Sequence, residues 1–168
     1  PNGVSTSLPA DVQRKFLRTI KGLENSEILV DGYAVEYDVV DTTDLDITLQ
    51  SQSVPGAYFA GQLNGTSGYE EAAGQGLVAG TNAVFSLLGR DPFILDRQES
   101  YIGVMIEDLV SDKRDEPYRL FTARSENRLF IREDNVVVRM RPYRAQMLLN
   151  TGLDRYQESF IDQFNVLI

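Results

Sequence analysis

The chain has 168 residues, 42% of them hydrophobic and 24% charged, which is the composition of one ordinary globular domain with its own core. It contains no cysteine and no histidine, so disulfides, thiol nucleophiles, Cys/His zinc sites and Ser-His dyads are excluded within it. The net charge of −9 argues against a simple nucleic-acid-binding module, and no apolar run reaches the roughly 18 residues of a membrane span. Nor does any loop have calcium-binding spacing, so we expect no metal site.

The N-terminal part of the sequence has one helical pattern and several short strand patterns. Residues 7–22 predict a helix, because a capping serine and a first-turn proline precede apolar residues at helical spacing, and a glycine ends the run. Short strands are predicted at 27–30 and 33–37, on either side of an Asp-Gly turn, and another at 47–50.

The middle of the chain is rich in glycine. Residues 56–80 hold seven of the thirteen glycines. The apolar run 57–60 predicts a buried strand, which leads into a loop at 61–67 and a helix over about 68–88. The many small residues of this helix indicate close packing against a sheet or a ligand.

The remainder of the chain is predicted to be mainly helical. Residues 91–96 are a connector, 101–110 a helix, and 111–116 an exposed charged segment. Residues 119–144 are rich in arginine, and the apolar spacing from 145 to the end predicts one or two amphipathic helices.

A strand, a glycine loop and a small-residue helix form an arrangement that holds phosphorylated cofactors. Glycines let the backbone approach a ligand closely, and the helix N-terminus offers free N–H groups. Gln62, Asn64 and Thr66 are candidates for additional side-chain hydrogen bonds. The same pattern fits a tight turn in any α/β protein, and because no Gly-x-Gly-x-x-Gly follows a first strand, spacing alone leaves both interpretations open.

The arginine-rich segment differs in charge from the rest of the chain. Residues 119–144 contain seven arginines and three acids, a local charge of +4, while the rest carries −13. On a helix, Arg124, Arg128 and Arg132 would share one face, and guanidinium groups suit the phosphates of an RNA backbone. Ion pairing with the chain's many carboxylates is the alternative explanation.

Four runs of the sequence resemble the MnmG family, also called glucose-inhibited division protein A. They are PNGVSTSLP at 1–9, GYAVEYD at 32–38, AGQLNGTSGYEEAAGQGLVAGTNA at 60–83 and EPYRLFTARSENRLFIREDN at 116–135. The resemblance implies a mixed α/β fold: a fragment of a glutathione-reductase-type FAD-binding fold, followed by a mainly helical segment. Residues 1–90 would be the C-terminal part of the FAD-binding domain, and residues 91–168 an arginine-rich connector that contacts tRNA.

The resemblance also implies a function. Enzymes of this family bind FAD, use reduced nicotinamide and methylene-tetrahydrofolate, and act with the GTPase MnmE. They install an aminomethyl-type group at carbon 5 of the wobble uridine of tRNA. A cytoplasmic location, or alternatively a mitochondrial one, and a homodimer are implied for the complete enzyme, with no membrane partner.

Candidate site residues follow from the same runs, although no catalytic residue is indicated. FAD contact is expected at Gly61, Gln62, Asn64, Gly65, Thr66, Gly68 and Tyr69, and RNA contact at Arg119, Arg124, Arg128 and Arg132. Tyr69 is interpreted either as stacking on the flavin or as a core tyrosine. Glu70 and Glu71 are interpreted as acids of a helix first turn and not as acid/base machinery.

The resemblance does not extend to the family's N-terminal nucleotide-binding unit or to its C-terminal GTPase-docking region. We therefore expect the chain to be part of a longer enzyme and to be neither active nor a tight FAD binder by itself. The alternative is a non-catalytic truncated relative that serves as an interaction or structural subunit of a larger assembly.

Overall fold

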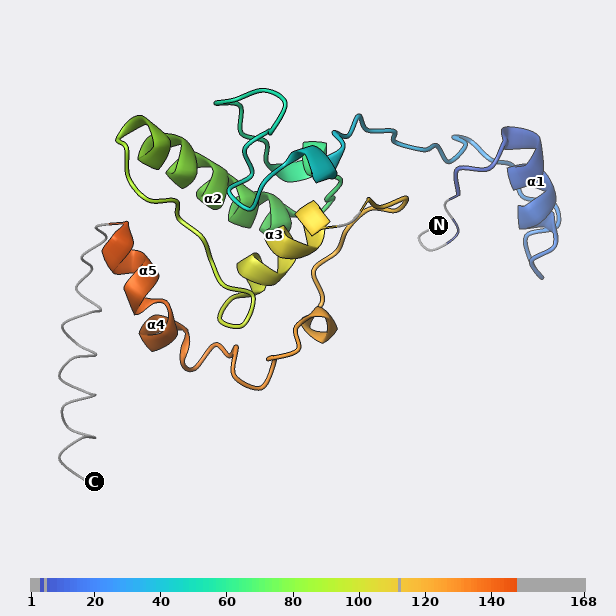
Figure 1. The fold of residues 1–168 in the computed structure, drawn as a ribbon. Coiled ribbons are helices and arrows are strands. Elements are labelled where there is room, and N and C mark those ends of the chain that lie inside the picture. The colour runs from blue at the N-terminus through green and yellow to red at the C-terminus, as the bar shows by residue number, and fades with distance from the viewer. Residues whose placement is uncertain (1–3, 5, 112, 148–168) are drawn as a thin grey trace, which may run out of the picture. The chain divides into compact units, whose positions relative to one another are not determined.

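The computed structural model describes Val4, residues 6–111 and residues 113–147. The chain divides into two compact units, Pro1–Asp38 and Val39–Ile168, which are treated separately below (Figure 1). The predicted boundary near residue 90 concerns the domains of a longer protein and stays a prediction.

The first unit contains helix α1, Ala10–Arg18, which confirms the helix predicted in this part of the chain. It begins after Pro9, with an acid in its first turn and two basic residues in its last, so both ends complement the helix dipole. The buried Gln13 donates from its Nε2 to the carbonyl oxygens of Leu8, 2.6 Å, and Gly32, 2.8 Å. Its Oε1 accepts from the Gly32 amide at 2.8 Å. One side chain thus ties α1 to segments on either side of it.

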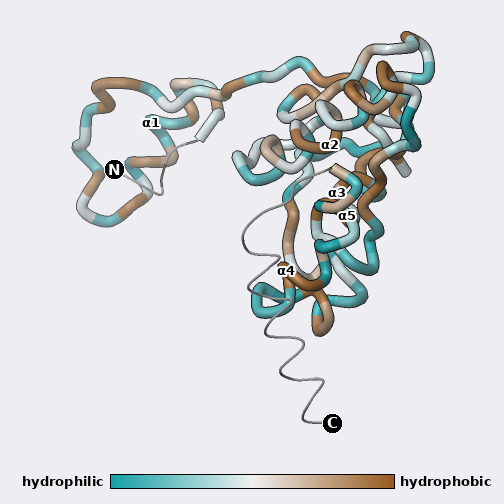
Figure 2. The backbone as a smooth tube through the Cα atoms, turned by 90° about the vertical axis from the view of Figure 1, so that its left-hand side faces the viewer, coloured by the Kyte–Doolittle hydropathy of each residue, from teal (hydrophilic) through white to brown (hydrophobic). Residues whose placement is uncertain are grey.

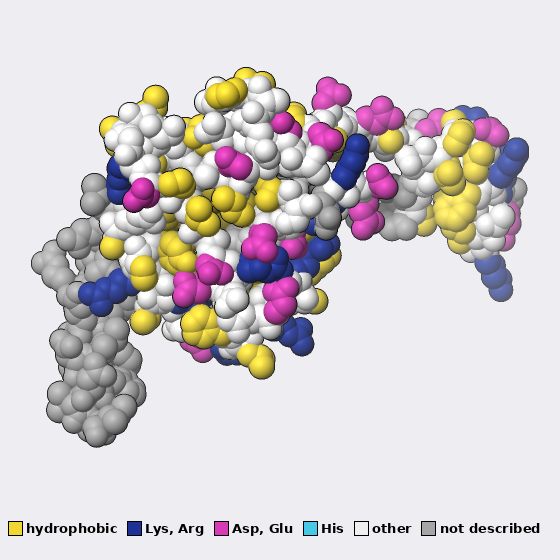
Figure 3. Space-filling model, in the orientation of Figure 1, with side chains coloured by type: hydrophobic (Ala, Val, Ile, Leu, Met, Phe, Trp, Pro, Cys, Tyr) yellow, Lys and Arg dark blue, Asp and Glu magenta, His cyan; other side chains and the backbone are white. Residues whose placement is uncertain are grey.

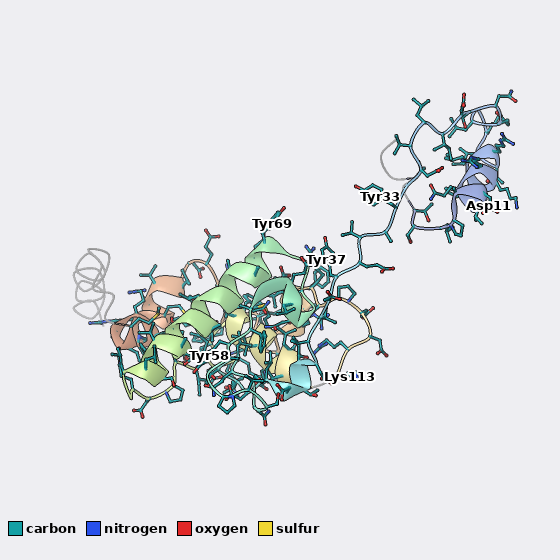
Figure 4. All side chains as sticks on the ribbon, turned by 90° about the horizontal axis from the view of Figure 1, so that it is seen from above. Asp11, Tyr33, Tyr37, Tyr58, Tyr69 and Lys113 are labelled. Atoms are coloured by element: carbon teal, nitrogen blue, oxygen red, sulfur yellow. The ribbon has the colours of Figure 1, made fainter. Side chains whose placement is uncertain are left out.

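The strands predicted at 27–30 and 33–37 are not present. Residues 33–37 are extended but form no β-bridge among the described residues, and the Asp-Gly turn is bonded to Gln13 instead of closing a hairpin. Tyr33, Val35 and Tyr37 alternate along the chain as in a strand, yet all three are exposed. Figure 4 shows Tyr33 and Tyr37 standing off the backbone trace. The strand prediction for 33–37 is wrong, because the alternation of residue types is not matched by an alternation of buried and exposed side chains or by a bridge among the described residues.

The second unit is built on helices. Its long helices are α2, Tyr69–Leu87, and α3, Tyr101–Ser111, and its short ones are η1 (Thr42–Asp44), η2 (Gly61–Asn64), η3 (Thr122–Arg124), α4 (Val136–Arg139) and α5 (Arg141–Gln146). The two long helices confirm the predictions for 68–88 and 101–110. The amphipathic helices predicted beyond residue 147 lie outside the described residues.

The core of this unit forms where α2 meets α3. At Gly74 an added Cβ would lie 3.2 Å from side-chain atoms of both Ile102 and Met105, so this glycine permits the close approach of the two helices. The buried apolar side chains that pack into one cluster here are Leu45, Leu49, Val78, Ala79, Phe85, Phe93, Leu95, Met105, Ile106, Leu109 and Tyr118. Each large one contributes about 1.5–3 kcal/mol by burial. Figure 2 shows apolar and polar stretches alternating along the chain of this unit, as expected when one side of each helix faces the core and the other faces solvent.

The connector between α2 and α3 is held at Phe93 by one side-chain amide of α2. Asn82 donates from Nδ2 to the Phe93 carbonyl oxygen at 2.9 Å and accepts from the Phe93 amide at 2.7 Å. This paired bond holds the Phe93 ring in the core, where it meets Phe85 edge-on at 6.4 Å. Ser100 then starts α3, because its hydroxyl accepts the amide of Gly103 at 3.2 Å.

The mixed α/β prediction is not confirmed, because the described residues contain isolated bridges and no strand. The bridge from Gln50 to Tyr58 brings the predicted strands 47–50 and 57–60 together in an antiparallel pair. The pair stops after one bridge, because Leu49 has a φ of 66°, which a strand residue does not adopt. No helix among the described residues is long and apolar enough to cross a membrane.

Candidate cofactor loop and arginine segment

The glycine loop is a tight, ordered turn between an extended residue and a long helix. Ala60 is extended, Gly61 has a φ of 79°, η2 follows, and Gly65 has a φ of 76°. The left-handed region costs a residue with a side chain about 1–2 kcal/mol, so glycine is favoured at both positions. Gly68 is the N-cap of α2. The predicted order of loop and helix is therefore confirmed.

Gln75, on α2, holds the loop in this shape. Its side chain is fully buried, with an exposed fraction of 0%. Its Oε1 accepts from the Gly61 amide at 3.1 Å and from Asn64 Nδ2 at 2.8 Å. Its Nε2 donates to Thr66 Oγ1 at 2.9 Å and to the Glu71 carbonyl oxygen at 3.1 Å. All four hydrogen-bonding positions of the amide are used, so the loop has one well-defined conformation.

Two predicted cofactor-binding side chains face this network. Asn64 also donates to the Phe59 carbonyl oxygen at 2.9 Å, and Thr66 Oγ1 donates to the Gly61 carbonyl oxygen at 3.0 Å. Both residues are buried, and their donors are used inside the loop. Their structural role was not foreseen from the sequence. The available signal was Gln75 itself, an amide that lies, like Asn82, among mostly small and apolar residues on the buried face of α2.

The other predicted loop residues expose groups that a ligand can reach. Gln62 is exposed, and the open side of Gly65 has no atom within 4 Å of an added Cβ. Tyr69 is 93% exposed and points away from the start of α2 in Figure 4, so it is not a core tyrosine. The amides of Tyr69 and Glu70 have no hydrogen-bond acceptor within the described part of the chain.

The glycine loop is joined directly to the arginine segment. Thr66 and Tyr118 form a parallel bridge, and the Tyr118 amide donates to the Gly65 carbonyl oxygen at 2.8 Å. Two residues further on, the Leu120 amide donates to Glu71 Oε1 at 2.9 Å. Arg119 Nε lies 3.7 Å from the same oxygen. Two segments about fifty residues apart in sequence are thus held side by side.

Glu71 is an acid with an exposed fraction of only 3%. The Leu120 amide is the largest influence that lowers its pKa below the usual range of a glutamate, against the opposing effect of burial; Arg119 adds a smaller lowering effect. Its second oxygen, Oε2, is buried and has no partner among the described residues. A Cβ on Gly68 would lie 1.6 Å from this oxygen, so the carboxylate occupies the space beside that glycine.

Tyr118 anchors the start of the arginine segment. It is buried, its hydroxyl donates to Asp108 Oδ2 at 3.0 Å, and burial together with the Asp108 charge raises the pKa of this phenol. The guanidinium groups of Arg114 and Arg124 lie 5.0 Å and 4.5 Å from the centre of its ring. Arg124 is further held by a 2.7 Å bond from its Nε to the Arg119 carbonyl oxygen.

Arg124, Arg128 and Arg132 do not share one helical face, because the condition for it, a continuous helix, is not met. η3 ends at Arg124, Arg128 lies in a turn, and Arg132 follows that turn. The Ser125 hydroxyl accepts from the Asn127 amide at 3.2 Å, and such a local bond competes with helix formation.

The three arginines also differ in what they contact. Arg132 pairs with Asp134 at 3.2 Å, as the ion-pair interpretation predicts, whereas Arg124 stacks on Tyr118. Arg128 is exposed, and its side chain makes no ion pair or hydrogen bond with the described residues.

A further group of charges lies beside this segment. Arg97 Nη1 lies 3.0 Å from Glu107 and 3.4 Å from Asp108, and its Nη2 lies 2.7 Å from Glu126. The hydrogen bond to Glu126 is the main reason that the pKa of Arg97 is raised. Figure 3 shows acidic and basic side chains interspersed on this unit. No group of three or more Asp or Glu among the described residues is arranged to hold a metal ion.

Comparison with known proteins gives the chain its family. The family model described as "Glucose inhibited division protein A" matches residues 1–91. The chain is 52% identical over 171 residues to a Helicobacter pylori protein named tRNA uridine 5-carboxymethylaminomethyl modification enzyme MnmG, covering 99% of this chain and 28% of that protein. A Syntrophotalea carbinolica protein of the same name is 56% identical to this chain, which covers 24% of that protein's length.

A solved structure agrees with the sequence comparison. The Aquifex aeolicus GidA structure in its form II crystal superposes with a TM-score of 0.77 at 48% identity, over 97% of this chain and 27% of that one. The chain thus spans about a quarter of the length of the relatives it matches. Because the family model covers more than half of the chain and the superposition almost all of it, the chain belongs to the glucose inhibited division protein A family.

Proposed function

We propose that this chain is part of an FAD-dependent enzyme that modifies the wobble uridine of tRNA. The observation that carries the proposal is the 52% identity, along 99% of the chain, to a protein named for modifying tRNA uridine. The finer proposal is an aminomethyl-type group at carbon 5, with reduced nicotinamide and methylene-tetrahydrofolate as co-substrates. It includes the GTPase MnmE as partner, a homodimer and a cytoplasmic location.

The glycine loop fits contact with FAD through its backbone. Gly65 is open on one side, and the amides of Tyr69 and Glu70 are free to donate. Glu70 and Glu71 place two carboxylates in the first turn of α2, which disfavours a phosphate there and favours a ring edge. FAD, when bound, supplies the electron transfer of the reaction.

Within this proposal the predicted loop residues have separate roles. Gln62, Gly65 and Tyr69 present backbone or exposed groups to the flavin ring, whereas Gly61, Asn64 and Thr66 keep the loop in shape through Gln75. Gly68 is buried beside Glu71 and starts α2. The arginine segment contacts the tRNA backbone. To test the function, the enzyme that contains this chain is incubated with tRNA and the co-substrates, and the wobble nucleoside is analysed by mass. An unmodified uridine would contradict the proposal.

The isolated 168-residue chain is expected to bind FAD more weakly than micromolar. It offers the backbone of one loop and has no Gly-x-Gly-x-x-Gly for the pyrophosphate. The measurement is a titration of FAD followed by its fluorescence. Submicromolar binding by this chain would contradict the expectation.

Arg128→Ala is expected to weaken tRNA binding and to leave stability unchanged. Arg128 is exposed and without a partner among the described residues, so its loss removes one phosphate contact and lowers the salt slope of log affinity by about one unit. Its effect on the free energy of unfolding should stay within ~0.5 kcal/mol. The measurement is tRNA affinity at several salt concentrations beside a denaturant midpoint.

Two companion variants complete this test. Arg124→Ala should lower both the salt slope and the midpoint, because it also removes the stacking on Tyr118. Arg18→Ala, an exposed arginine of α1, serves as the control. An unaltered slope for Arg128→Ala would show that this arginine does not contact RNA.

A further inference from the structure

We propose that Glu71 is a positioning residue that couples the glycine loop to the arginine segment, so that FAD and tRNA each change the other's affinity. This inference rests on the proposed function, since it concerns the same two ligands. The contacts that carry it run from the N-terminus of α2 to Arg124.

The first step is the position of the Glu71 carboxylate. It lies in the first turn of α2, buried against Gly68, and its Oε1 accepts the Leu120 amide at 2.9 Å. The same oxygen lies 3.7 Å from Arg119 Nε. One side chain of the cofactor loop's own helix therefore fixes both the backbone and a guanidinium group of the arginine segment.

The second step is a return contact to the loop. The Arg119 carbonyl oxygen accepts from Arg124 at 2.7 Å, Arg124 lies over the Tyr118 ring, and the Tyr118 amide bonds to Gly65 at 2.8 Å. Together with the contacts of Glu71, these contacts form a closed ring of interactions that joins the glycine loop, the start of α2 and the arginine segment. Moving Gly65 or the start of α2 must displace Arg119 or Arg124, and the reverse also holds.

The third step is thermodynamic. A ligand that orders the glycine loop also orders the segment bonded to it, so the second ligand loses less conformational entropy on binding. Such coupling is reciprocal: the factor by which FAD changes tRNA affinity equals the factor by which tRNA changes FAD affinity. Typical factors are about 5–150.

The test measures tRNA affinity of the enzyme containing this chain, with and without FAD, for the wild type and three variants. Glu71→Ala removes both contacts of the carboxylate, and Glu71→Gln keeps an acceptor for Leu120 but removes the charge beside Arg119. Glu27→Gln is the control, because it makes the same charge change on an exposed glutamate outside the glycine loop and the arginine segment. The pKa of Glu71 is lowered, so at neutral pH the wild-type residue is ionised.

The wild type and Glu27→Gln should bind tRNA on the order of tenfold more tightly when FAD is bound. Glu71→Gln should reduce this factor and Glu71→Ala should bring it close to one, each with its FAD content retained. Circular dichroism checks folding, and Glu71→Gln decides the matter if the alanine variant does not fold. A wild-type factor of one, or Glu71→Gln equal to Glu27→Gln, overturns the inference. A wild type that binds neither ligand instead overturns the proposed function.

Discussion

Replacing Gln75 by alanine is expected to lower the free energy of unfolding by about 3 kcal/mol or more and to abolish FAD retention in the enzyme that contains this chain. The Gly61 amide and one of the two Asn64 amide bonds lose their acceptor inside the protein, and Thr66 loses its donor. Each buried polar group left unsatisfied costs about 1–3 kcal/mol, and the removed side chain leaves a cavity.

The matched control for this variant is Gln98→Ala. Gln98 is exposed and, among the described residues, uses only its backbone in hydrogen bonds, so its truncation should cost less than ~0.5 kcal/mol. The measurements are a urea unfolding curve for each variant and the flavin absorbance of the purified enzyme. If the two variants unfold at the same urea concentration, Gln75 does not organise the loop.

The glycine loop was predictable from sequence because its conformation depends on local backbone chemistry. Glycines at 61 and 65 permit a left-handed backbone, and the apolar spacing after Gly68 predicts the helix. What the loop does with its polar side chains was not predictable. Whether Asn64 and Thr66 face a ligand or an interior amide depends on the position of Gln75, which is a tertiary contact.

The predicted strands and the shared arginine face are absent from the structure for a different reason. Each depends on a structural context that residue spacing does not specify. The alternation at 33–37 predicts two faces of a strand but not the strand that pairs with it. The i,i+4 spacing of Arg124, Arg128 and Arg132 predicts one face only if the segment is helical. Bonds from residues 97–98 to Glu126 and Asn127 hold that segment in turns instead.

The same distinction applies to the proposed RNA contact, because the arginines of this segment lie in different environments. Arg132 and Arg119 lie near carboxylates, at 3.2 Å from Asp134 and 3.7 Å from Glu71. Arg132 and Asp134 are both exposed, and a pair of this kind contributes about 0–1 kcal/mol, so RNA phosphate can compete for Arg132. The charge contrast in the sequence singles out this segment, and its contact with RNA stays a prediction. The environments of its individual arginines depend on contacts that the structure alone supplies.

Gly103→Ala is expected to destabilise the chain by about 3 kcal/mol or more, or to prevent folding. A Cβ at this position would lie 2.4 Å from the Leu95 carbonyl oxygen and 2.6 Å from both the carbonyl carbon and the oxygen of Asp96. These are backbone atoms of the connector, which cannot rotate away as a side chain can, so α3 and the connector must separate. The alanine's better helix propensity offsets only about 1 kcal/mol of this cost.

Gly80→Ala on α2 is the matched control for Gly103→Ala. An added Cβ at Gly80 meets nothing within 4 Å, so the same substitution should raise the free energy of unfolding by about 0.5–1 kcal/mol. Urea unfolding of both variants gives the comparison. The separation of α3 from the connector should also release Arg97 from Glu107 and Asp108, so the stability of Gly103→Ala should respond less to added salt than that of Gly80→Ala. Equal stability of the two variants would show that the connector does not lie against α3 at this glycine.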